Sequence, residues 1–186
     1  MVGMRGLWIP IVLSAVIVFV VSSIIHMTPL WHKSDYPAVP DQDKILDALR
    51  SFNIPQGDYM LPRAADMADM RTDAFKAKMN RGPVVMMTVM PPGLNFMSSS
   101  LAYWFLYVLV VSAGAAFVAG RTMGAGADSH RVFHIVALTA AFSYVLALWQ
   151  MSIWYRRAWS LTIKATVDGI IYAALTAGVF VWFWPR

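Results

Sequence analysis

The chain has 186 residues, of which 59% are hydrophobic and 13% charged, and its formal net charge is +5. Soluble domains have about 25% charged residues, so this composition indicates a polytopic membrane protein. The chain has no cysteine, which excludes disulfides, thiolate metal sites and a cysteine nucleophile. The excess cations flank apolar segments, which is typical of contact with lipid headgroups and not of nucleic-acid binding.

Four apolar runs are long enough to cross a bilayer, which takes about 20 residues. We predict spans at about residues 7–27, 101–120, 132–155 and 165–184. The first run follows a short basic start. It is too long for a signal peptide and no small-residue cleavage site follows, so we interpret it as an uncleaved anchor. The predicted fold class is an all-α membrane protein with four transmembrane helices and a partly helical extramembrane insert, residues 28–99.

The insert is polar and rich in turn signals. DQDKILDALRSF, residues 41–52, predicts a helix with apolar residues along one side. A turn-rich link over 53–62 and a second predicted helix over 64–80 follow. Residues 81–100 are apolar but interrupted by prolines, so we expect them to lie at the membrane interface or to pack on the helices.

An even number of spans puts both termini on one side of the membrane and the insert on the other. Charge counting is ambiguous: the short loops are nearly balanced, and only a count that includes the eight Lys/Arg of the insert itself favours a cytoplasmic insert. The anchor-like start favours cytoplasmic termini and an exported insert. We prefer the second orientation, because a loop longer than about 60 residues is largely exempt from the charge rule.

Either orientation brings one group of polar residues to the insert side of the membrane. These residues are His26, His32, Asp35, Arg156, Arg157, Lys164 and Asp168. Asp168 is expected about one turn into the fourth span, near the positive end of the helix dipole. We predict that it forms a structural ion pair with Lys164, Arg156 or Arg157. The alternative is a proton or cation site, since ionisable groups within a membrane are functional candidates.

Two histidines and a carboxylate on this side can bind Zn²⁺ or Cu²⁺. His26 and His32 lie either side of a Thr-Pro break, with Asp35 beyond, and their spacing matches no established metal motif. Histidines satisfied by hydrogen bonds are the simpler interpretation. His130 and His134 lie at the opposite membrane face. The methionines can bind Cu(I) but fit packing better, and the sequence names no cofactor.

Small residues recur every four positions in two of the spans. The stripes are Ser112, Ala116 and Gly120 in the second span, and Gly169, Ala173 and Ala177 in the fourth. Such spacing lets helix backbones approach closely, either within the chain or against another subunit. The chain has no phosphate-binding loop, zinc-protease motif or dinucleotide fingerprint, so an enzyme is the less favoured interpretation.

Three stretches together resemble a group of small bacterial inner-membrane proteins with no assigned function. They are HKSDYPAVPDQDKILDALRSFNIPQGDYMLP, RGPVVMMTVMPPGLNFMSSSLAYWF and DGIIYAALTAGVFVWFWPR, about half of the chain. The resemblance implies a bacterial inner-membrane protein and transfers no site residue. We expect an accessory or structural subunit that contacts the lipid bilayer and other membrane subunits, or itself. The alternative is a small transporter or metal-handling protein.

Overall fold

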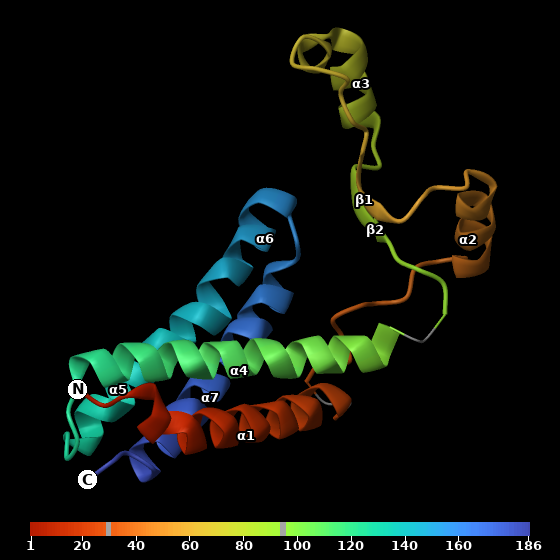
Figure 1. Cartoon of the computed structure of the whole chain (residues 1–186). Coiled ribbons are helices and arrows are strands. Elements are labelled where there is room, and N and C mark those ends of the chain that lie inside the picture. The colour runs from red at the N-terminus through yellow and green to blue at the C-terminus, as the bar shows by residue number, and fades with distance from the viewer. Residues whose placement is uncertain (29–30, 94–95) are drawn as a thin grey trace. The chain divides into compact units, whose positions relative to one another are not determined.

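The computed structural model describes residues 1–28, 31–93 and 96–186, without the side chain of Phe96 (Figure 1). The chain divides into two compact units. The first, here called the bundle, comprises Met1–Pro37 and Asn95–Arg186. The second, the insert unit, comprises Ala38–Leu94. The insert unit is therefore shorter than the predicted insert, because residues 31–37 belong with the bundle.

Within the described residues, four helices are long and apolar enough to cross a membrane, as predicted. The first is α1, Trp8–Met27, preceded by the 3-10 turn η1, Met4–Leu7. The second is α4, Phe96–Thr122. The third consists of α5, Ser129–Ala141, the π-helical turn η3, Phe142–Leu146, and α6, Ala147–Tyr155. The fourth is α7, Trp159–Trp182. This is the pattern of a multi-pass membrane protein.

Local chemistry sets the ends of these helices. The Asp128 side chain caps the start of α5 by accepting a hydrogen bond from the backbone N–H of Arg131 at 3.1 Å. Arg156 ends α6 in the left-handed conformation, with φ of 56°. The chain then turns so sharply that α7 begins at Trp159, six residues before the predicted span.

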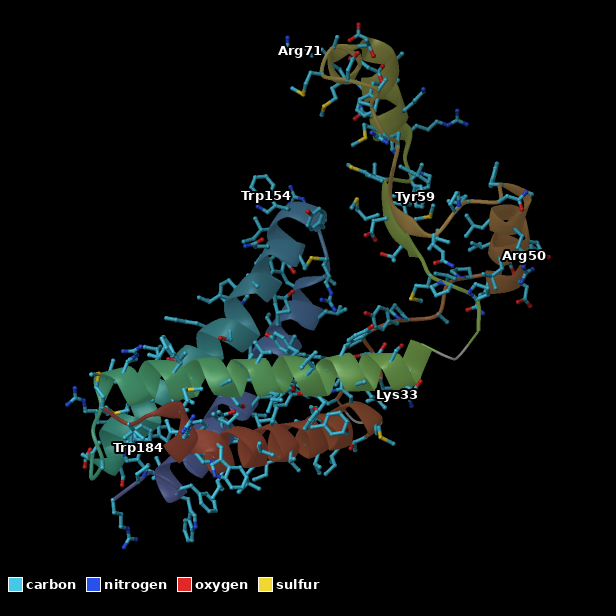
Figure 2. The ribbon with its side chains drawn as sticks, viewed as in Figure 1. Lys33, Arg50, Tyr59, Arg71, Trp154 and Trp184 are labelled. Atoms are coloured by element: carbon cyan, nitrogen blue, oxygen red, sulfur yellow. The ribbon has the colours of Figure 1, made fainter. Side chains whose placement is uncertain are left out.

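The bundle core has an apolar end near the termini and an aromatic part nearer the insert side. Leu7, Val132 and Phe180 are fully buried in the apolar end. Trp184 lies at this end of the bundle (Figure 2). Its indole donates a hydrogen bond to the Gly124 carbonyl at 3.0 Å. The aromatic part of the core contains the following buried side chains: Val18, Val108, Tyr144, Tyr172 and Ala173.

Both small-residue stripes are packed inside the bundle. Ser112, Ala116 and Ala177 are fully buried, and Ala173 is 2% exposed. The remaining two positions are glycines in close contact with other elements. A Cβ on Gly169 would lie 2.7 Å from Val145 Cγ2, and a Cβ on Gly120 would collide with the carbonyl of Val2. The stripes therefore serve packing within the chain.

The insert unit contains two short helices and a two-stranded sheet. The helices are α2, Gln42–Ser51, and α3, Asp73–Arg81, with the 3-10 turn η2, Asp69–Arg71, before α3. The strands β1, Gly57–Leu61, and β2, Val85–Val89, pair antiparallel, with Gly57 opposite Val89 and Leu61 opposite Val85. The sheet pairing brings Met60 opposite Met86.

The structure corrects two predictions for the insert and adds a strand to a third segment. The supposed link over 53–62 contains β1, and the proline-interrupted segment 81–100 contains β2. The second helix begins at Asp73 and not at residue 64. Before it, Asp66 Oδ1 accepts from the backbone N–H groups of Ala68 and Asp69, each at 2.8 Å, which replaces the helical hydrogen bonds. The Thr72 hydroxyl then caps α3.

Candidate functional site

The segment after α1 folds back along α7, and Lys164 holds it there. The Lys164 ammonium donates to the Trp31 carbonyl oxygen at 2.7 Å and to Ser34 Oγ at 3.0 Å. It also donates to Asp35 Oδ1 at 2.6 Å. These three bonds use all the donors of the ammonium group. The Lys164 and Asp35 side chains are only 18% and 13% exposed, so water screens this pair less than a surface pair.

Asp35 connects Lys164 with the imidazole of His32. Its Oδ2 lies 2.7 Å from His32 Nδ1. The Lys164 hydrogen bond, and then that of His32, hold the pKa of the Asp35 carboxyl below its ordinary value. Asp35 therefore remains ionised at neutral pH, and its charge favours a proton on His32 Nδ1.

Asp168 lies beneath this segment and is only 3% exposed. Its Oδ1 accepts a hydrogen bond from the Trp31 indole N–H at 3.0 Å. Its Oδ2 lies 3.1 Å from His32 Nε2, within ion-pair distance. These two atoms nevertheless lack hydrogen-bond alignment, and both are buried without a hydrogen-bond partner. A carboxylate oxygen and a ring nitrogen at this distance repel each other unless a proton or a metal ion lies between them.

The structure differs from the sequence prediction in the position and in the partner of Asp168. Because α7 begins at Trp159, Asp168 lies about two and a half turns into the helix, beyond the reach of the terminal dipole. Lys164 binds Asp35 instead of Asp168. Within the described residues, Arg156 and Arg157 form no ion pair, and Arg156 serves to end α6.

His26 lies at the end of α1, next to His32. The two rings are stacked, with centroids 4.3 Å apart and planes inclined by 11°. His26 Nδ1 lies 2.9 Å from the Ser22 carbonyl oxygen, which can only accept, so this nitrogen carries a proton. The Ser22 hydroxyl accepts from Trp104 Nε1 of α4 at 2.8 Å. Ser22 therefore contacts both His26, through its carbonyl, and α4, through its hydroxyl.

Aromatic side chains form the floor of the site. The Tyr172 ring, one turn after Asp168, packs edge-on against Trp104 and Tyr144, with centroid distances of 6.0 and 5.7 Å. The Tyr172 hydroxyl is buried without a hydrogen-bond partner. Below these rings the core becomes the apolar end of the bundle, so the polar cluster is confined to the insert side.

The predicted metal ligands are only partly brought together. His26, His32 and Asp168 each offer a donor atom, and these three atoms lie within 4.8 Å of one another. Asp35 instead holds the far side of the His32 ring. His130 and His134 lie near the start of α5, with ring centroids 4.3 Å apart. They are separated from the first pair by the length of the bundle.

Sequence reasoning missed Trp31 and Ser34 as members of this site. Nothing in the sequence around Trp31 points to a partner 137 positions away. Within the described residues the site shows no nucleophile held by a base and an orienting group, which is the arrangement that covalent catalysis requires. The contacts that the structure shows in the site are ion pairs and hydrogen bonds.

Comparisons with protein-family models, with curated proteins and with solved structures found no match.

Proposed function

We propose that the protein is a non-enzymatic accessory or structural subunit of a bacterial inner-membrane complex, and that it presents the insert unit to a partner protein. The observation that carries this proposal is the apolar side of α2. Its four large apolar side chains are 40–71% exposed, and they are Ile45, Leu46, Leu49 and Phe52. Contiguous apolar surface of this kind marks interaction sites.

The polar cluster of the bundle supports the same proposal. Lys164 and Asp168 fix residues 31–35, and the insert unit begins at Ala38, directly after this segment. The segment that leads into the insert unit is thereby attached to the transmembrane helix α7.

The surface proposed for the partner does not include the small-residue stripes. The sequence left open whether the small-residue stripes contact another subunit or pack within the chain, and they are packed within the bundle. The exposed apolar side of α2 takes their place. Exposed methionines of the insert unit, among them Met60, Met86 and Met90, add adaptable contact surface.

Copurification tests this proposal. The full-length protein, solubilised from native membranes with an affinity tag, should bring down at least one specific partner, identified by mass spectrometry. Replacing both Leu46 and Leu49 with aspartate should abolish that copurification while leaving thermal stability unchanged, because these side chains are about 40% exposed. A matched control replaces Asp43 and Asp47 with serine on α2. Unchanged recovery of the partner with the Leu46/Leu49 variant contradicts the proposal.

A small transporter or metal-handling protein is the second candidate. One observation favours metal binding: donor atoms of His26, His32 and Asp168 lie close together. The apolar end of the bundle gives no support for transport across the membrane, because Phe180 and Val132 are fully buried there.

A further inference from the structure

We propose that His26, His32 and Asp168 form a binding site for one divalent transition-metal ion, Zn²⁺ or Cu²⁺. The donor atoms come from the end of α1, from the segment after it and from the middle of α7, and they lie within 4.8 Å of one another. Two imidazole nitrogens and a carboxylate oxygen are ligands of these ions, whereas Ca²⁺ and Mg²⁺ prefer oxygen alone.

The hydrogen bonds of both histidines leave the correct nitrogen free. His26 donates from Nδ1 to the Ser22 carbonyl, and His32 Nδ1 faces the Asp35 carboxylate. In each ring the proton on Nδ1 leaves Nε2 as the atom with an available lone pair. A metal-binding histidine characteristically has its second nitrogen held by a carbonyl or a carboxylate. Asp35 is thus a positioning residue and not a ligand.

Two of the three donors are buried without a hydrogen-bond partner. His32 Nε2 and Asp168 Oδ2 are 3.1 Å apart, and their side chains are 15% and 5% exposed. Buried polar atoms normally have hydrogen-bond partners, so two buried polar atoms that face each other without one are uncommon. A metal ion between them would accept both lone pairs. The separation is close to that between two ligand atoms of a tetrahedral zinc ion, whose bonds are about 2.0–2.2 Å long.

The charge of the surroundings suits a divalent cation. Two carboxylates, Asp35 and Asp168, face a single ammonium, that of Lys164. With neutral imidazoles the cluster has an excess of one formal negative charge. Lys164 is directed at Asp35 and at the carbonyl of Trp31, so it does not occupy the space between the three donors.

Metal binding requires one local movement. The rings of His26 and His32 are nearly parallel, so their in-plane lone pairs do not converge on one point. His26 is exposed, so the proposed movement is a tilt of its ring toward the other two donors. Three protein ligands leave a fourth position for water or another small ligand.

Zinc titration of the full-length protein in nanodiscs tests the inference. The protein should carry an affinity tag without histidine, and His130→Ala and His134→Ala should be introduced to remove the second histidine pair. Competition with a chromogenic chelator should then show one Zn²⁺ per chain. Co²⁺ in place of Zn²⁺ should give the visible absorption bands of a low-symmetry, four-coordinate ion. His26→Gln should weaken Zn²⁺ binding at least tenfold, and because His26 is exposed this variant should fold.

Two further variants separate ligation from folding. Asp168→Asn should abolish the Co²⁺ bands, and Asp35→Asn should weaken binding about tenfold while retaining them, as expected for a residue that orients a ligand. Lys33→Gln, an exposed change in the same segment, should leave binding unchanged. Absence of saturable Zn²⁺ binding, or binding that His26→Gln leaves unchanged, overturns the inference and leaves His32 and Asp168 as a protonated ion pair. Neither result bears on the partner contact of α2.

Discussion

At the scale of single residues, the contacts of Asp168 explain why a membrane helix carries a carboxylate. The group is buried, and it is approached from outside the helix by the Trp31 indole at one oxygen and by the His32 ring at the other. The sequence identified Asp168, His32 and Lys164 as residues of one membrane face. It could not assign the partners, because several cations had similar reach and the donor Trp31 belongs to a segment with no regular periodicity.

Replacing Trp31 with phenylalanine should reveal the value of this hydrogen bond. The ring remains, but Asp168 Oδ1 loses its indole donor in a buried position. We expect a loss of about 1–3 kcal/mol in the free energy of unfolding, the cost of an unsatisfied buried group. Unfolding in mixed micelles with increasing denaturing detergent measures it. Trp154→Phe is the control, because Trp154 is 77% exposed. Equal stability of the two variants would show that the bond contributes nothing.

Lys164→Met should loosen the segment that it holds. Methionine keeps most of the apolar part of the side chain but removes the ammonium group, and with it the three hydrogen bonds to Trp31, Ser34 and Asp35. Backbone amides of residues 31–36 should therefore exchange their hydrogens faster, with little change in α1. Lys33→Met is the matched control within the same segment, since Lys33 is exposed. Exchange in 31–36 that is equally fast in both variants would refute the anchoring role of Lys164.

At the scale of elements, hydropathy predicts the four spans, because an uninterrupted run of about 20 apolar residues matches the thickness of a bilayer core. Helix ends were less predictable: α7 begins at Trp159, six residues before the predicted span, because hydropathy marks the apolar run and not the end of the helix. The sheet was missed because β1 and β2 have only five residues each and are separated by more than 20 residues that include α3. No short hairpin signal exists in such a sequence.

Gly169 tests how closely α7 packs on the third span. A Cβ there would lie 2.7 Å from Val145 Cγ2 and 3.2 Å from Tyr144 Cβ, both in η3. Gly169→Ala should therefore lower the free energy of unfolding by about 1–3 kcal/mol, the usual cost of overpacking. On the same helix, a Cβ on Gly178 would meet nothing within 4 Å, so Gly178→Ala should cause no loss. A Gly169→Ala variant as stable as Gly178→Ala would contradict this packing.

At the scale of the whole molecule, presentation of the insert unit to a partner requires it to be on one defined side of the membrane. We predict that it is exported, on the basis of the anchor-like first span. The natural chain has no cysteine, so Ser51→Cys introduces a single thiol at an exposed position of α2. It should react with an impermeant maleimide in intact spheroplasts. Ala125→Cys, at an exposed position between α4 and α5, should react only after lysis. The reverse pattern would place the insert unit in the cytoplasm.

Contact between the apolar side of α2 and a partner protein is the basis of the proposed function, and photo-crosslinking in native membranes can detect it. A photoreactive amino acid at Leu49 should give an adduct with a different protein, because this side chain is on the exposed apolar side. The same probe at Asp47, which is paired with Arg50 on the polar side, should give little or none. An adduct formed at Leu49 only with the same chain or with lipid, or equal adducts at both positions, would contradict the proposed contact.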